Sequence, residues 1–290
     1  MTRVLGIASR GGTLRTDDGQ GIRAGLNVRG TGMPPVSNQW FAGAGDGESY
    51  RGSRVLPRVL DVPFKVYGDS RAAVWDRISL ISRIFDPRLG PVRLTIELDG
   101  EEWYADVRRE GGGDWTWGED TDGSTYLKTI VTAKAGDPYW QRANEESKNI
   151  VLGGLGRGLI KDTGGSTDSL SKLRVSTTAA FGSVTFSNSG DVEAFGKWRV
   201  TAPFDGFSLI SPFDEALTFE DTKTTGWIDV DMELGTITDE LGENRYDGLA
   251  ATPRFWTIPS GESEADVLVE SATSDSRITV IWSPRKWVLF

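Results

Sequence analysis

Neither cysteine nor histidine occurs among the 290 residues of the sequence. A chain without cysteine forms no disulfide, offers no thiol nucleophile and holds no zinc through thiolates. A chain without histidine cannot contain a Ser-His-Asp triad, a Cys-His pair or a histidine-ligated metal. The composition therefore excludes the commonest hydrolase and metalloenzyme chemistries, and leaves only carboxylate, lysine, tyrosine or Ser-Lys catalysis open.

Long apolar runs are missing as well. Residues 1–12 carry few apolar side chains before glycines interrupt them, so we expect no secretory signal. No apolar run elsewhere approaches the length of a membrane span. If the protein acts outside a cell, we expect its release by another route, such as lysis of a host.

Positive charge is scarce, because 32 Lys and Arg residues stand against 42 Asp and Glu residues, giving a formal net charge of -10. Binding duplex nucleic acid through its phosphates needs clustered cations, so this balance argues against it. An acidic surface favours solubility. It would equally suit a channel through which DNA slides without adhering.

The residues that are present favour β-structure with one helix near the start of the chain. Apolar and polar side chains alternate over residues 60–66, which is typical of a half-buried strand. Asp69-Ser70 is a helix N-cap signal, and apolar residues recur at helical spacing from Val74 to Phe85. The sequence therefore predicts a strand followed by a helix that covers one face of a sheet.

A hairpin follows the predicted helix. Residues 92–98 alternate again, and Asp99-Gly100 is a strong turn signal before a return strand over residues 102–108. A further strand is predicted over residues 125–133. We expect the loop between these strands, residues 110–124, to be polar and rich in glycine.

These patterns predict a mainly β protein with two domains. Residues 1–142 are expected to form an N-terminal β-sandwich or split barrel with one flanking α-helix. Residues 143–180 are rich in Gly, Ser and Thr and are interpreted as a linker or insertion. Residues 181–290 contain short strands roughly every ten residues, a rhythm typical of an antiparallel β-sandwich or jelly roll.

Seven of the 11 tryptophans fall into two groups. Trp40, Trp115 and Trp117 lie in glycine-rich loops, where burial by a partner chain is expected. The hairpin of residues 98–107, the loop of residues 111–124 and the loop from Trp40 to Tyr50 are the candidate interfaces. The strand patterns also predict core positions for Trp103, Trp227, Trp256 and Trp282. The candidate ring or partner interface consists of Trp40, Tyr50, Trp103, Trp115 and Trp117.

No motif indicates catalysis, a metal or a cofactor. The carboxylates Asp229, Asp231 and Glu233 share one strand face, but a calcium loop would need glycine where Leu234 stands, so a solvated sheet face is favoured. The glycines at 153–158 lack the spacing of a dinucleotide loop. Paired carboxylates could make a glycosidase without histidine, but no spacing selects a pair.

The order of several short stretches resembles the distal tail protein family of siphophages, also described as minor tail proteins. In the first half the resemblance rests on Arg54–Val66, Gly90–Leu94 and Asp137–Trp140, and in the second half on Ser187–Ala194, Gly226–Asp229, Gly242–Asn244 and Phe255–Gly261. The resemblance implies a galectin-like or carbohydrate-module-like sandwich for the second domain. It also implies a non-enzymatic structural role without a cofactor.

The same resemblance implies a place in the virion, at the tail tip, after assembly in the host cytoplasm. A homohexameric ring of N-terminal domains would continue the tail tube, with DNA only in transit through its channel. Expected partners are the tail tube protein, the tape measure protein, the tail hub or tail-associated protein, and fibre or receptor-binding proteins. The alternative function is a carbohydrate-binding module that adheres to host cell-wall glycans through exposed tryptophans.

Overall fold

A computed structural model describes residues 4–16, 19, 21–24, 28–115, 125–151 and 179–289 of the chain. The chain divides into two compact units. Unit 1 comprises Met1–Asn144 and Arg285–Phe290, and unit 2 comprises Glu145–Pro284. In the described part of the chain, no helix has the length and apolarity that a bilayer crossing requires.

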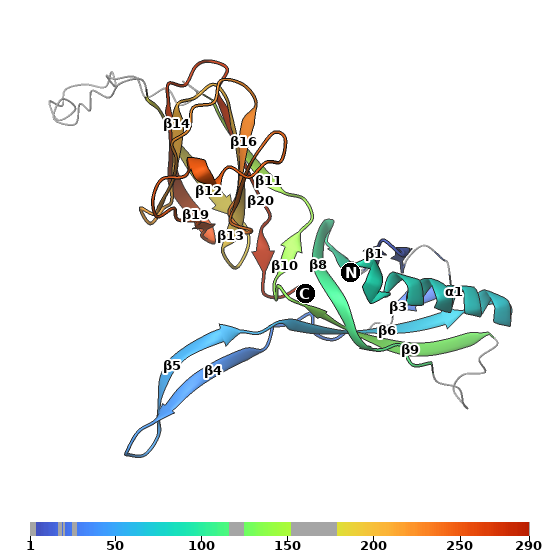
Figure 1. Ribbon diagram of the computed structural model, residues 1–290. Helices are drawn as coiled ribbons and strands as arrows, with labels where there is room; N and C mark the ends of the chain where they lie inside the picture. Colours follow the sequence, from blue (N-terminus) through green and yellow to red (C-terminus); the bar gives the residue numbers. More distant parts are fainter. Residues whose placement is uncertain are drawn as a thin grey trace. The chain divides into compact units, whose positions relative to one another are not determined.

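Unit 1 is built on a curled, nine-stranded antiparallel sheet with the order β2-β1-β7-β8-β9-β6-β3, to which β10 is added beside β8 and β21 beside β10 (Figure 1). Its strands are β1 (Val4–Ser9), β2 (Gly12–Arg15), β3 (Ile22–Ala24), β4 (Val36–Ala42), β5 (Glu48–Val55), β6 (Arg58–Tyr67), β7 (Val92–Leu98), β8 (Glu101–Gly112), β9 (Tyr126–Ala135), β10 (Trp140–Arg142) and β21 (Arg285–Lys286). Strands β4 and β5 form a separate two-stranded ribbon.

The long strand β8 explains how one sheet can enclose a core. Its first part pairs with β7, and its last part pairs with β9, with Val107 opposite both Val92 and Ala135. A bulge between Arg109 and Gly111 bends the strand in the part that pairs with β9. The predicted turn at Asp99-Gly100 joins β7 to β8, and both of its residues have positive φ, as a tight hairpin turn requires.

The helix α1 (Arg71–Ile84) lies against β1, β2 and β6 and closes the core of unit 1, and the short helix η1 (Pro87–Leu89) follows it. The hydroxyl of Ser70 accepts a hydrogen bond from the Ala73 amide and caps the helix as predicted. Gly11 is required at the β1–β2 turn, because a Cβ there would lie 2.1 Å from the Arg83 carbonyl oxygen. The expectation of a helix packed on one face of the sheet is confirmed.

A buried arginine joins distant segments of unit 1. The Arg58 side chain, 1% exposed, donates hydrogen bonds to the carbonyl oxygens of Pro138 (2.7 Å), Gly30 (2.5 Å) and Trp287 (2.6 Å), and also to that of Gly32. Its guanidinium lies 5.5 Å from the centre of the Trp140 ring. Arg58 therefore fixes the start of β6, the turn before β10 and the C-terminal segment together.

Burial changes the acid–base properties of this arginine. Desolvation lowers the pKa of Arg58 to about 10, while the Asp137 carboxylate acts in the opposite direction. The guanidinium therefore remains charged at neutral pH. Asp137 also accepts a hydrogen bond from Arg285 at 2.9 Å, which ties β21 to the same turn.

Unit 2 is an antiparallel β-sandwich, as predicted. One sheet has the order β11-β20-β13-β16-β17 with β18 beside β13, and the other has the order β12-β19-β14-β15. Aromatic side chains fill the space between them, including Phe186, Trp198 and Trp282. Its elements are β11 (Glu146–Val151), β12 (Ala179–Asn188), β13 (Ala194–Thr201), β14 (Gly206–Ile210), β15 (Ala216–Phe219), β16 (Trp227–Asp231), β17 (Thr236–Asp239), η3 (Tyr246–Gly248), β18 (Thr257–Ile258), β19 (Gly261–Glu270) and β20 (Arg277–Trp282).

The unit boundaries differ in two places from those expected. Within the expected linker, β11 pairs with β20 along its whole length, because Lys148 and Ile150 alternate in register with Val280 and Ile278. At the other end, β21 leaves unit 2 and pairs with β10. Leu289 then enters the core of unit 1. The glycine-rich motif at 153–158 lies outside the described residues.

We predict that Arg58→Ala lowers the free energy of unfolding by about 3–5 kcal/mol, because it empties a buried site and leaves four partly buried carbonyl groups without their donor. Arg58→Lys should restore only part of the loss, since an ammonium group lacks the planar fork. Urea unfolding measures both. The matched control is Arg54→Ala on the exposed ribbon, expected within about 0.5 kcal/mol of the original. A loss at Arg58 as small as the control's would contradict the prediction.

Candidate functional site

The ribbon of β4 and β5 is the most exposed element of unit 1 (Figure 1). Every residue of β4 is exposed, and in β5 only Gly52 and Val55 are half-buried. The Leu56 amide donates a hydrogen bond to the Pro35 carbonyl oxygen at 2.8 Å and closes the ribbon at its root. A two-stranded ribbon on its own is marginally stable in water, which makes this element a candidate interface.

Large aromatic side chains gather near the end of the ribbon. Trp40 and Tyr50 lie opposite each other in the register and touch edge to face, with ring centres 5.3 Å apart. Phe41 projects from the other face, where the Arg51 guanidinium lies 5.1 Å from its ring centre. All three aromatic residues are more than half exposed. Exposed aromatic rings of this kind are typical of a protein interface.

The turn at the ribbon's end is acidic. Asp46 and Glu48 are both exposed on either side of Gly47, which adopts a positive φ of 89°. The sequence predicted a loop from Trp40 to Tyr50, but the residues on both sides of the turn pair with each other. They form paired strands instead, because Trp40 and Tyr50 pack across the ribbon although no core lies beneath them.

A second surface of unit 1 is the outer face of β3, β6 and β9, opposite the face that packs on α1. Arg23, Lys65 and Lys128 are direct cross-strand neighbours there, and form a row of three cations, here called the cationic row. Beside the row, Tyr67 and Tyr126 stack at 5.5 Å. Arg23 lies over the Tyr67 ring and Lys128 over the Tyr126 ring.

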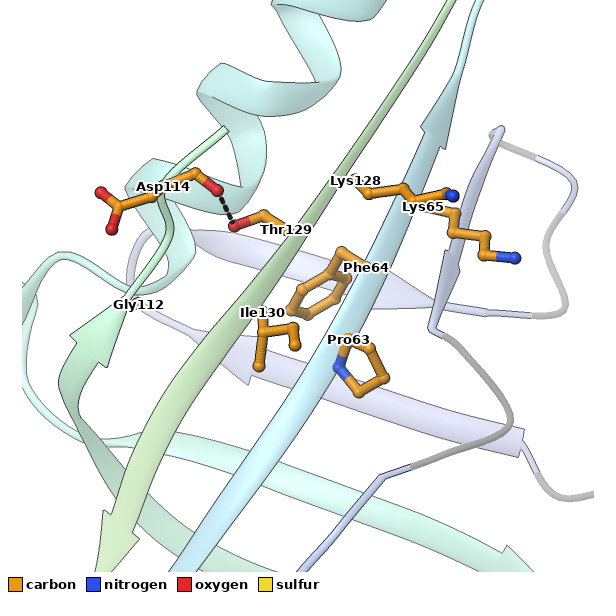
Figure 2. Close-up of a pocket in the computed structure, with 8 residues that line it drawn as sticks. All are labelled: Pro63, Phe64, Lys65, Gly112, Asp114, Lys128, Thr129 and Ile130. Atoms are coloured by element: carbon orange, nitrogen blue, oxygen red, sulfur yellow. Dashed lines mark hydrogen bonds between the residues drawn. The ribbon is translucent and has the colours of Figure 1, made fainter. Parts of the chain in front are cut away.

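A hollow of about 440 Å³ adjoins the cationic row. Figure 2 shows Lys65 and Lys128 extending in the same direction from neighbouring strands, with Pro63 and Ile130 further along the same pair of strands. The Thr129 hydroxyl donates a hydrogen bond to the Asp114 carbonyl oxygen at 2.7 Å. This bond joins β9 to the segment after β8 that also lines the hollow. The hollow is lined by Pro63, Phe64, Lys65, Gly112, Asp114, Lys128, Thr129 and Ile130.

The five residues predicted from the sequence as a ring or partner interface do not form one surface. Trp40 and Tyr50 meet on the exposed ribbon. Trp103 is 2% exposed and belongs to the core of unit 1, so its assignment to an interface is wrong. Trp103 lies on the inward side of β8, and the Lys286 ammonium group lies over its ring. Trp115 is half-buried and packs against the same core, and Trp117 lies outside the described residues.

Of the four predicted core tryptophans, Trp103, Trp256 and Trp282 are buried, whereas Trp227 is not. Trp256 and Trp282 are each 3% exposed in unit 2. Trp227 is half-buried, with the Arg199 guanidinium 4.7 Å from its ring centre. Sequence reasoning missed the cationic row, because strand alternation places Lys65 on a polar face but gives no cross-strand register.

The carboxylates of the second unit are engaged by neighbouring side chains. Arg199 makes two hydrogen bonds to the Asp229 carboxylate, at 2.7 and 2.8 Å, and these hydrogen bonds raise the pKa of Arg199. Lys197 lies 3.6 Å from Asp231. Asp231 also accepts hydrogen bonds from the amides of Glu233 and Leu234. Within the described residues, no group of three or more Asp or Glu side chains could hold a metal ion.

The two units define a class of protein in which a curled, helix-backed antiparallel sheet is followed by a β-sandwich. This fold matches the crystal structure of the SPP1 Dit (gp 19.1) protein, described as a paradigm of the hub adsorption apparatus in phages that infect Gram-positive bacteria. The TM-score is 0.68 at 14% identity, over 97% of this chain and 99% of that chain.

Two structures of the phage P2 baseplate in its activated conformation, with Ca and with Sr, also match. Each gives a TM-score of 0.56 at 12% identity over the whole of both chains. No protein-family model and no curated protein matches the sequence. The mainly β architecture implied by the resemblance to distal tail proteins is thereby confirmed.

We predict that Trp103→Ala lowers the free energy of unfolding by about 3–5 kcal/mol, because it empties a large buried site. Trp40→Ala, at a site that is 55% exposed, should change it by no more than about 1 kcal/mol. Chemical unfolding followed by circular dichroism measures both, at a concentration where light scattering gives the mass of one chain. Equal losses at the two sites would contradict the assignment of Trp103 to the core.

Proposed function

We propose that this protein is a structural component of a phage tail tip. Unit 1 forms a ring that continues the tail tube, and unit 2 presents surfaces to which tail-tip, fibre or receptor-binding proteins attach. The proposal is supported by the fold match over nearly the whole chain, including 99% of the SPP1 Dit chain. The observation that carries the ring is the exposed β4–β5 ribbon, which has no covering layer in the single chain.

A projecting ribbon suits a ring for a geometric reason. The ribbon and the surface that receives it are different patches, so each copy uses one patch on each neighbour. Such head-to-tail contacts close into a ring when the rotation between copies divides a full turn. We propose that six copies close the ring as a homohexamer, with DNA in transit through its channel.

The proposed partners follow from the position of the ring between the tail tube and the tail tip. One rim of the ring contacts the tail tube protein, and the tape measure protein ends at the channel. The other rim contacts a tail hub or tail-associated protein. The assembly takes place in the host cytoplasm, and the finished protein resides in the virion. The role is one of attachment and passage and requires neither catalysis nor a cofactor.

Adhesion to cell-wall glycans finds less support in unit 2. Trp198, Trp256 and Trp282 are buried, and Trp227 is half-buried beneath the Arg199 guanidinium. These are the four tryptophans of the unit, and a sugar platform needs an open ring face. Unit 2 is therefore proposed as a docking module for other proteins.

We predict that Trp40→Ala combined with Tyr50→Ala abolishes ring assembly, because it removes the paired aromatic anchors of the ribbon. Sedimentation velocity and negative-stain electron microscopy of the full chain are the measurements. The control is Phe213→Ala, which removes an aromatic ring that is 68% exposed in unit 2. Rings formed as readily by the double variant as by the control would exclude the ribbon. An original protein that remains a single chain at every concentration would contradict the ring itself.

A further inference from the structure

We infer that residues 285–289, here called the strap, complete unit 1 only after unit 2 has been made, and that the completed unit 1 fixes the β4–β5 ribbon. The strap follows unit 2 in the sequence and yet belongs to unit 1. Because a chain is synthesised from its N-terminus, unit 1 stays incomplete until synthesis has passed through unit 2. One part of the inference rests on the proposed ring, namely that only a chain with a completed unit 1 enters it.

The first argument is that the main chain of the strap is bound to unit 1 at three places. Strand β21 pairs with β10. The Trp287 carbonyl oxygen accepts a hydrogen bond from Arg58 at 2.6 Å. The Leu289 amide donates a hydrogen bond to the Thr31 carbonyl oxygen at 3.4 Å. Backbone groups that leave water need such partners, so these bonds fix the path of the strap across unit 1.

The second argument is that side chains of the strap contact unit 1 separately. Arg285 is 7% exposed and donates a hydrogen bond to the Asp137 carboxylate at 2.9 Å. The Lys286 ammonium group lies 4.6 Å from the ring centre of Trp103. Leu289 is 4% exposed and belongs to the core of unit 1. A segment that only trailed over the surface would not bury an arginine and a leucine, so the strap is an integral part of the unit.

The third argument is what unit 1 loses without the strap. The three-residue strand β10 pairs with β8 on one side and with β21 on the other, so it would become an edge strand. Arg58, which is 1% exposed, would lose the Trp287 acceptor. A buried donor that loses its acceptor is destabilising. Unit 1 without the strap should therefore be less stable, and the loss should be centred on Arg58.

The strap reaches the ribbon through the same hydrogen bonds. Residues 30–32 precede β4, and Arg58 follows β5. Arg58 donates hydrogen bonds to the carbonyl oxygens of Gly30 and Gly32 as well as to the strap. The strap in turn binds Thr31. One network that includes the strap thus holds the chain on both sides of the ribbon, and the ribbon loses a constraint at both of its ends when the strap is absent.

The first test compares two leucines of the full chain. Leu289→Ala removes a buried anchor of the strap, and the control Leu241→Ala removes a side chain that is 79% exposed in unit 2. Leu289→Ala should lower the melting temperature of unit 1 by at least about 5 °C. It should also speed hydrogen exchange of the Leu56 amide, at the root of the ribbon, at least about tenfold. Leu241→Ala should change neither quantity.

The second test separates the need for the strap from the need for its covalent connection. A chain that ends at Pro284 should form no rings in sedimentation velocity. In another variant, a protease recognition sequence is inserted between Ser283 and Pro284, and the chain is cleaved after it has folded. The strap should then stay bound through its own contacts, as native mass spectrometry would show. Ring assembly and the melting temperature of unit 1 should match those of the uncleaved protein.

The inference is overturned if the chain that ends at Pro284 unfolds and assembles as the original protein does. It is also overturned if the cleaved peptide leaves and unit 1 keeps its melting temperature, because the strap would then add nothing to the unit. A shortened chain that keeps its stability and its Leu56 protection but forms no rings would make the strap a contact between copies instead. An original protein that forms no ring would refute the proposed function, while the melting temperature and the Leu56 exchange would still test the strap.

Discussion

The hydrogen bonds from the Arg58 guanidinium to four carbonyl oxygens connect parts of unit 1 that are distant in sequence. A buried cation is costly unless its donors are satisfied, so the accepting segments must hold one arrangement. Only two residues separate Arg58, where β6 begins, from Val55, where the ribbon ends. The buried network therefore fixes the chain next to the β4–β5 ribbon, which has no core of its own.

This fixed attachment explains how the ribbon can remain exposed in a single chain. A two-stranded ribbon gains little from its own contacts, and exposed tryptophan and tyrosine rings are unfavourable in water. Both features would become favourable in the proposed ring, where a neighbouring copy would cover the ribbon.

Local signals in the sequence predicted the regular elements well. Ser70 caps α1, and Asp99-Gly100 forms the turn between β7 and β8. The alternation of residues 60–66 places Phe64 in the core. The interface predictions were weaker, because glycine-rich surroundings do not distinguish a loop from an exposed ribbon. Trp103 shows the second limit: the strand pattern placed it correctly in the core, and its additional assignment to an interface was wrong.

The sequence by itself determined the class of chemistry and the secondary structure. The absence of cysteine and histidine and the periods of its apolar residues are local properties that need no knowledge of neighbours. Only the tertiary structure decided which strands pair and in what register. Register brings Arg23, Lys65 and Lys128 side by side from three separate strands, and it pairs β21 with β10. Contacts between residues far apart in the chain depend on the free energy of the whole fold, which no short stretch encodes.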